Sequence, residues 1–163
     1  MRSLVVGRFQ PLQLGHLKMI EYVAQRSSYL TIGIGSCNSE SSKQNPFTAE
    51  EREDMLRQSL TIETPYEFRR IPDFGDGVKW VSWIRQNITF DVFYTNSANE
   101  RGIFESAGLK VEEIPFFERE RYSATEVRKR ILEGGNWAEL MPHGAVKVMS
   151  SIDGEHRMRK TSG

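Results

Sequence analysis

The sequence predicts an α/β protein built on one doubly wound, parallel sheet, and three observations predict it. Short apolar segments rich in β-branched residues alternate with segments whose apolar residues recur at helical spacing, through five strand–helix units. Repeats, low-complexity stretches and linkers do not interrupt this alternation. The 163 residues are 38% hydrophobic and 27% charged, which suits a folded domain with a sizeable core. Parallel strands need crossover helices on both faces of the sheet, so we expect a single domain over residues 1–163.

The strands are expected where β-branched and aromatic residues gather between turn residues. These segments are residues 3–9, 29–36, 66–72, 90–96 and 109–115. In open sheets of this kind, ligands bind beyond the carboxyl ends of the strands, where the strand order reverses. The turns that follow the strands should therefore carry the functional residues.

Helices are expected between and after the strands, at residues 15–27, 45–60, 78–88, 99–108, 123–135 and 137–152. Two of them begin with a capping box, Thr48 with Glu51 and Ser123 with Glu126, in which side chains satisfy free N–H groups. Gly134 should end the second of these helices in the left-handed conformation. The last residues, about 154–163, are expected to form a frayed, solvated tail.

Composition excludes several classes of protein. The formal net charge is zero, so no overall field attracts nucleic acid. The one cysteine, Cys37, permits neither a disulfide framework nor a cysteine metal cluster. No apolar run reaches the roughly 20 residues of a membrane span, and the N-terminus lacks a secretory signal. We therefore expect a cytoplasmic protein without nucleic-acid or membrane partners.

The turn after the first strand, "GRFQPLQLGH", has the composition of a phosphate site. Gly7 lets the chain turn sharply, Pro11 restricts it within the turn, and Gly15 permits close approach of another backbone. His16 lies in the first turn of the following helix, where free N–H groups and the helix dipole favour an anion. The same glycines would also serve a tightly packed strand–turn–helix with no ligand. By contrast, "GIGSCN" lacks the third glycine of a dinucleotide fingerprint.

These residues carry a resemblance to a known family. "GRFQPLQLGH" resembles the first signature of the nucleotidylyltransferase superfamily, G-x-F-x-P-x-H-x-G-H, and "YSATEVR" resembles its second motif, S-x-T-x-x-R. "NPFTAEERE" is similar to a stretch typical of archaeal-type nicotinamide mononucleotide (NMN) adenylyltransferases, and the similarity runs from residue 1 to about 152. The resemblance implies a Rossmann-like fold and an enzyme that joins the adenylyl group of ATP to NMN. Its products would be NAD and pyrophosphate, with Mg²⁺ entering with ATP and no metal ligands supplied by the chain.

The resemblance also implies an ATP-binding set that matches the two motifs. Its members are Gly7, Arg8, Phe9, Gln13, Gly15, His16, Ser123, Thr125 and Arg128. Among them, Arg8, His16 and Arg128 would be catalytic. His16 would stabilise charge that develops at the α-phosphorus, and Arg128 would hold the leaving pyrophosphate.

Two positions depart from the family pattern. Gln13 stands where the family usually carries the first histidine of H-x-G-H, and its amide can donate a hydrogen bond but carries no charge. Related enzymes often have an arginine just before "DPFT". Here the loop contains Lys43, a less rigid cation that would compensate.

The NMN-binding set is expected after the middle strands, at Asp73, Trp80, Thr95 and Asn96. The resemblance places Trp80 against the nicotinamide ring, where an indole face attracts the cationic pyridinium. Trp83 lies three residues further along the same helical face and is expected in the core, and the alternative is that both tryptophans belong to the core.

Two alternatives remain open at this point. The two motifs bind only the nucleotide and do not select the acceptor. An enzyme with another phosphate acceptor, such as phosphopantetheine, FMN or a cytidylyl substrate, would therefore have the same motifs. A non-catalytic regulator that binds NAD or ATP would also keep the motifs, and Gln13 is compatible with it. The resemblance further implies a homo-oligomer such as a hexamer.

Overall fold

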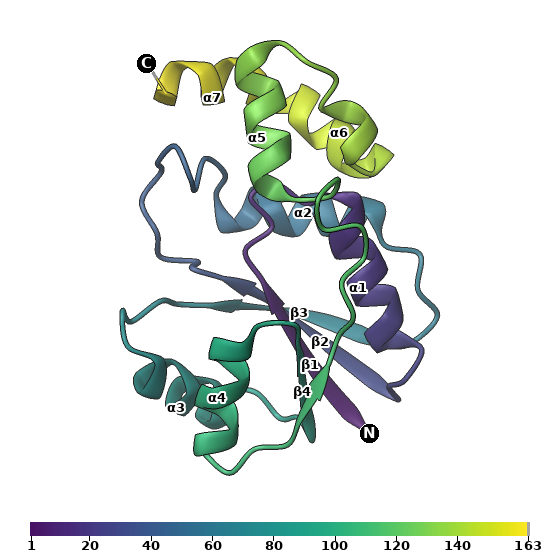
Figure 1. The fold of residues 1–163 in the computed structure, drawn as a ribbon, viewed down its shortest axis with the longest axis vertical. Helices are drawn as coiled ribbons and strands as arrows, with labels where there is room; N and C mark the ends of the chain where they lie inside the picture. Colours follow the sequence, from purple (N-terminus) through teal and green to yellow (C-terminus); the bar gives the residue numbers. More distant parts are fainter. Residues whose placement is uncertain (163) are drawn as a thin grey trace. The chain divides into compact units, whose positions relative to one another are not determined.

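The structure is a computed structural model that describes residues 1–162 (Figure 1). The chain forms two compact units, and each is assembled from three separate segments. The unit that we call the sheet unit contains residues 1–7, 19–38 and 62–116. The other, the helical unit, contains residues 8–18, 39–61 and the described chain from 117 onward. The assignment of the whole chain to one domain stays a prediction.

The sheet unit contains the five strands that the sequence predicts. They are β1 (Arg2–Gly7), β2 (Tyr29–Gly35), β3 (Tyr66–Ile71), β4 (Val92–Thr95) and β5 (Val111–Glu113). All neighbours pair in parallel, in the order β3-β2-β1-β4-β5. Strands β2 and β3 therefore lie on one side of β1, and strands β4 and β5 lie on its other side. This reversal of direction at β1 is the doubly wound arrangement. The α/β class and the parallel sheet are confirmed.

Helices α3 (Gly77–Asn87) and α4 (Ala98–Ser106) pack over one face of this sheet. Figure 1 places the part of α1 (Leu14–Ala24) that belongs to this unit on the opposite side. The core between the sheet and its two helices centres on Phe93 of β4 and Phe104 of α4, whose rings stack with centroids 3.7 Å apart. Burying each aromatic side chain contributes about 1.5–3 kcal/mol to this packing.

Gly33 explains why "GIGSCN" contains glycines without being a dinucleotide fingerprint. A Cβ at Gly33 would lie 2.5 Å from Cδ1 of Ile71 and 3.0 Å from Cγ2 of Val6. The missing side chain therefore makes room for two apolar residues, the buried Ile71 and the partly buried Val6, on the strands beside β2.

The helical unit contains helices α2 (Ala49–Ser59), α5 (Ala124–Glu133), α6 (His143–Ser151) and α7 (Gly154–Ser162), the short 3₁₀ helix η1 (Ala138–Leu140) and the start of α1. The capping box of Thr48 and Glu51 is present with both of its hydrogen bonds. Ser123 caps α5 by accepting from the N–H of Glu126, and Gly134 ends that helix at φ 73°. These local predictions are confirmed.

The prediction of a frayed C-terminal tail was wrong for Gly154–Ser162, which form α7. Met158 is buried, Arg159 Nε donates to the carbonyl of Ile131 at 3.2 Å, and Arg157 pairs with Glu51 at 2.6 Å. These partners come from α5 and α2, so tertiary contacts order a segment whose own sequence is polar. Residue 163 lies outside the described residues. In the part of the chain that the structure covers, no helix has both the length and the apolar character to cross a membrane.

Candidate active site

The turn that follows β1, residues 8–13, is the centre of the candidate site, and we call it the first-motif turn. Phe9 is buried and has φ of 53°, a backbone conformation that bulky side chains rarely adopt. The peptide bond between Gln10 and Pro11 is cis. A residue held at positive φ costs about 1–3 kcal/mol and persists only where its surroundings enforce it, which is common at ligand sites.

Three residues of the "NPFTAEERE" segment, Asn45, Phe47 and Arg52, hold the first-motif turn. The side chain of Gln10 both donates to the carbonyl of Phe47 and accepts from its N–H, each at 3.0 Å, and this pair is buried. Arg52 Nη1 donates to the carbonyl of Arg8 at 2.8 Å, and Arg8 Nη1 donates to Asn45 Oδ1 at 3.3 Å. The segment that resembles the NMN adenylyltransferases thus supports the turn that resembles the superfamily signature.

Gln13 and His16 cap the start of α1 together. Gln13 Oε1 accepts from the N–H of Gly15 at 2.5 Å, and the N–H of Gln13 donates to His16 Nδ1 at 3.1 Å. This is the geometry of a capping box with histidine in the position of the usual glutamate. Because Nδ1 accepts a hydrogen bond, the proton of the neutral imidazole lies on Nε2. His16 is therefore a hydrogen-bond donor through Nε2.

Burial lowers the pKa of His16 to about 4, so the imidazole is neutral at physiological pH. Its ring contacts the edge of Phe9, with centroids 5.0 Å apart. His16 is therefore a neutral hydrogen-bond donor with a fixed orientation, and not an imidazolium cation.

Gly15 is required by the packing of the second motif. A Cβ at this position would lie 2.7 Å from Gln13 Oε1 and 3.0 Å from Cβ of Tyr122. Tyr122 immediately precedes Ser123, which caps α5. The glycine of the first motif thus lets the start of the second motif approach α1 closely.

Arg128 completes the meeting of the two motifs. Its Nη1 donates to the carbonyl of Gln10 at 2.8 Å, and its Nη2 lies 3.4 Å from Thr125 Oγ1. Burial lowers the pKa of Arg128 below its ordinary value, but a guanidinium stays charged at neutral pH. His16 and Arg128, more than a hundred residues apart in sequence, both contact the first-motif turn.

A cavity of about 370 Å³ lies between the loop before α2 and the outer face of α5. Its lining includes Lys43, Thr125, Arg128 and Lys129, three of which are cationic, against one carboxylate, Glu133. Lys43 therefore lies at the same cavity as Arg128, where it adds positive charge. The excess of positive charge around this cavity would attract a polyanionic group such as a chain of phosphates.

The residues predicted to bind NMN lie in the sheet unit, as does Gly7 at the end of β1. Asp73 accepts from the N–H of Gly75 through Oδ1 at 2.9 Å and from Ser36 Oγ through Oδ2 at 3.4 Å. Asn96 Nδ2 lies 3.7 Å from the sulfur of Met19. Asp73 therefore also holds the turn after β3, whereas Asn96 contacts α1.

Thr95 and Trp80 likewise have structural partners. Thr95 Oγ1 donates to Glu100 at 2.8 Å, and although burial raises the pKa of Glu100, this hydrogen bond opposes part of the rise. Trp80 is half-buried and meets Phe104 edge-on at 5.5 Å, and Trp83 packs against the same core. Both tryptophans are half-buried, so burial does not show which of them is free to bind a ligand. The role of Trp80 stays a prediction.

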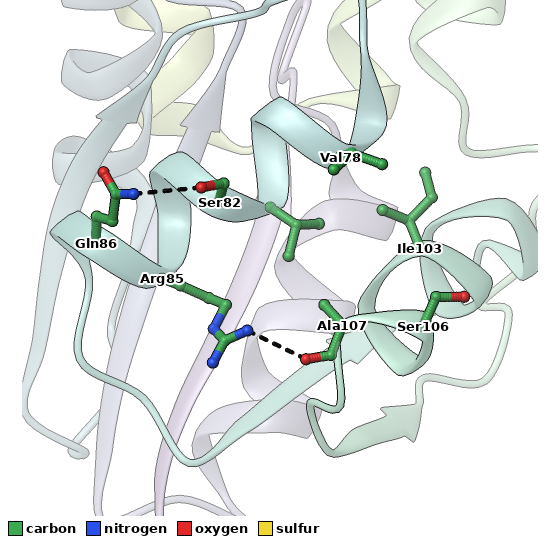
Figure 2. A pocket seen from close by; sticks show the side chains of 8 residues that line it. Val78, Ser82, Arg85, Gln86, Ile103, Ser106 and Ala107 are labelled. Carbon is green, nitrogen blue, oxygen red and sulfur yellow. Dashed lines mark hydrogen bonds between the residues drawn. The ribbon is translucent and has the colours of Figure 1, made fainter.

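The sheet unit also has a groove between α3 and α4, which Figure 2 shows. Its volume is about 560 Å³, and Arg85 Nη1 bridges the two helices by donating to the carbonyl of Ala107 at 3.2 Å. None of the predicted substrate-binding residues lines this groove.

Sequence reasoning did not assign Gln10 or Arg52 to the site. Gln10 lies inside the first motif, between its phenylalanine and its proline, and only the structure shows its pairing with Phe47. The sequence pattern could have identified Arg52, because it lies on the same face of its helix as the apolar residues Ala49, Met55 and Leu56. A cation on an apolar stripe is costly to bury and indicates a specific partner.

The pKa of His16 predicts how stability depends on pH. Because the folded-state pKa lies below the unfolded value of about 6.5, the unfolded chain binds a proton first as the pH falls. Stability is then lost between about pH 6.5 and 4. From pH 7.5 to pH 5, nucleotide-free wild type should lose about 2 kcal/mol more unfolding free energy than His16→Asn, measured by urea denaturation. Equal losses in the two proteins would contradict the lowered pKa.

Comparison with known proteins shows the family. The cytidylyltransferase-like family matches residues 4–130. The nicotinamide-nucleotide adenylyltransferase of Methanococcus aeolicus is 38% identical over 162 residues, which cover 98% of this chain and 94% of the relative. The enzyme of the same name from Archaeoglobus fulgidus is 36% identical over 171 residues, which cover 100% and 98%.

A solved structure shows the same fold. The crystal structure of a bifunctional NMN adenylyltransferase/ADP ribose pyrophosphatase from Francisella tularensis, in complex with AMP and a Mn ion, matches with a TM-score of 0.79. It is 21% identical and covers 98% of this chain, which spans about half (51%) of that longer protein. With both motifs assembled on one turn and a family match over most of its length, the chain belongs to the cytidylyltransferase-like family, alongside the archaeal nicotinamide-nucleotide adenylyltransferases.

Proposed function

We propose that the protein is a nicotinamide-nucleotide adenylyltransferase, which transfers the adenylyl group of ATP to NMN and releases NAD and pyrophosphate in NAD biosynthesis. The observation that carries this proposal is the meeting of His16 and Arg128 on the first-motif turn, in a chain 38% identical to an archaeal relative of that name. The same arrangement in a chain without such relatives would indicate only a nucleotide site.

On the ATP side, the chain acts by positioning and by electrostatic stabilisation. The NMN phosphate is already a nucleophile, so no serine or cysteine has to form a covalent intermediate. His16 donates from Nε2 to an α-phosphate oxygen, where negative charge grows during the in-line attack. Arg128 and Lys43, which line one cavity, hold the β- and γ-phosphates, and Arg8 supplies a further cation from the exposed side of the turn.

The metal enters this proposal as part of the substrate, MgATP. Among the described residues, no group of three or more His, Cys, Asp or Glu side chains is arranged to hold a metal ion. Mg²⁺ at nucleotide sites is usually held by the phosphates with few protein ligands, so the residues present fit this role.

On the acceptor side, we assign Trp80 to the nicotinamide ring and Asp73, Thr95 and Asn96 to the polar groups of NMN. The half-buried indole gives the pyridinium a cation–π partner worth about 1–2 kcal/mol when desolvated. Asp73 and Thr95 already form hydrogen bonds in the turns at the carboxyl ends of β3 and β4, so they present pre-organised groups. A cytoplasmic location and a homo-oligomer such as a hexamer are further proposals, and light scattering of the purified protein tests the second.

A panel of acceptors tests the function. Purified protein is incubated with ATP, Mg²⁺ and, in separate reactions, NMN, nicotinic acid mononucleotide, FMN or phosphopantetheine, while pyrophosphate release and the dinucleotide products are measured. We expect NAD and pyrophosphate in equal amounts with NMN. Turnover only with FMN or phosphopantetheine would replace the acceptor, and ATP binding without any turnover would indicate a regulator. The His16→Ala protein, purified in the same way, controls for contaminating enzyme.

A further inference from the structure

Arg52 is a buried cation that the proposed chemistry does not use. It lies on α2 with only 2% of its surface exposed, among the largest fully buried side chains of the described chain. A buried guanidinium needs hydrogen bonds that offset the free-energy cost of its desolvation. An apolar residue would fill this space at a lower desolvation cost. The presence of arginine here therefore indicates a role for its hydrogen bonds or its charge.

The hydrogen bonds of Arg52 join the start of α2 to the first-motif turn. Both its backbone N–H and its Nε donate to the carbonyl of Thr48, at 3.0 and 3.2 Å, so the guanidinium is fixed against its own helix. Its Nη1 then donates to the carbonyl of Arg8 at 2.8 Å, across 44 residues of sequence. A lysine could not reach both carbonyls in this fixed fork geometry.

This contact determines which way the peptide between Arg8 and Phe9 faces. In a planar trans peptide, the carbonyl and the following N–H point in opposite directions. Since the carbonyl of Arg8 points to Arg52, the N–H of Phe9 points away from α2. Phe9 in turn contacts the ring of His16 and is held at positive φ, so the orientation of this peptide is passed on to His16.

We propose that Arg52 is a positioning residue of the nucleotide site. It holds the first-motif turn so that the N–H of Phe9 and the Nε2 of His16 face the phosphates of a nucleoside triphosphate, and it places a fixed positive charge behind the turn. Backbone N–H groups aimed from a tight turn are a common way to bind phosphate. The proposal rests on the proposed function only in taking ATP as the nucleotide, because it concerns binding before any acceptor reacts.

The test uses Arg52→Lys and Arg52→Gln, with Arg57→Lys and Arg57→Gln as matched controls on the same helix. Arg57 is exposed and pairs with Glu53 one turn away, so it shares the helix and the charge of Arg52 but not its burial. Calorimetry measures the Kd for MgATP, steady-state kinetics measures KM for ATP and for NMN, and circular dichroism checks folding. We expect both Arg52 variants to weaken MgATP binding about tenfold or more and to leave KM for NMN unchanged. The Arg57 variants should match wild type.

A folded Arg52→Lys protein with wild-type Kd for MgATP would overturn the proposal, because a purely structural arginine would lower only the amount of folded protein. A measurement on wild type remains decisive if the variants do not fold. In ¹⁵N-phenylalanine-labelled protein, which carries nine phenylalanines, the amide of Phe9 should shift strongly on saturation with MgATP. An unshifted Phe9 amide would also overturn it.

These outcomes are separable from those of the proposed function. If NMN is not adenylylated but Arg52→Lys still weakens MgATP binding, the function fails and the role of Arg52 stands. If NMN is adenylylated and Arg52→Lys binds MgATP normally, the function stands and the role of Arg52 fails.

Discussion

Replacing His16 by alanine is expected to lower the turnover number for NAD formation by about 10²-fold or more. The reason is that Nε2 donates where charge grows in the transition state, and removal of one such donor typically costs 10²–10³-fold in turnover. Binding of NMN should change little, because His16 acts on the ATP side. Steady-state kinetics with each substrate varied in turn measures both quantities.

Two further variants separate the donor role of His16 from its capping role. His16→Asn keeps an acceptor for the N–H of Gln13 but lacks a donor at the Nε2 position. It should therefore lose as much turnover as His16→Ala and less unfolding free energy. His156→Ala, at an exposed histidine of α7, should leave turnover unchanged. A wild-type turnover number in His16→Ala would reduce His16 to a structural residue.

Gly144→Ala is expected to destabilise the protein by about 3 kcal/mol, the upper part of the range for overpacking a closely packed contact. Helices α2 and α6 meet at this glycine. A Cβ there would lie 2.3 Å from the carbonyl oxygen of Gln58 and 2.4 Å from its carbon. Backbone atoms in a helix cannot rotate away as a side chain can, so the helices would have to separate. Urea denaturation at pH 7.5 measures the loss.

Gly102→Ala is the matched control for this substitution. Gly102 also lies in a helix, α4, but a Cβ there would meet no atom within 4 Å. Alanine should therefore stabilise the protein by about 0.5–1 kcal/mol, because it lowers the entropy of the unfolded chain. If Gly144→Ala unfolded at the wild-type urea concentration, the close approach of α2 and α6 would be contradicted.

Local signals in the sequence predicted much of the fold. Runs of β-branched and aromatic residues between turn residues located all five strands, and the capping residues Thr48 and Ser123 located the starts of two helices. These predictions succeed because residue type and capping act on neighbours within one strand or one helical turn. The tail failed for the converse reason, since α7 is held by Glu51 and Ile131, which are far away in sequence.

The sequence by itself determined the parallel α/β sheet and the identity of the residues in the two motifs. Only the tertiary structure decided that Gln13 caps α1, that His16 is a neutral donor, and that Arg52 and Arg128 hold the same turn from two helices. The physical reason is that hydrogen-bond direction and desolvation depend on groups brought together by the fold. Residue type and spacing determine which chemical groups are present, and packing determines the direction in which these groups point.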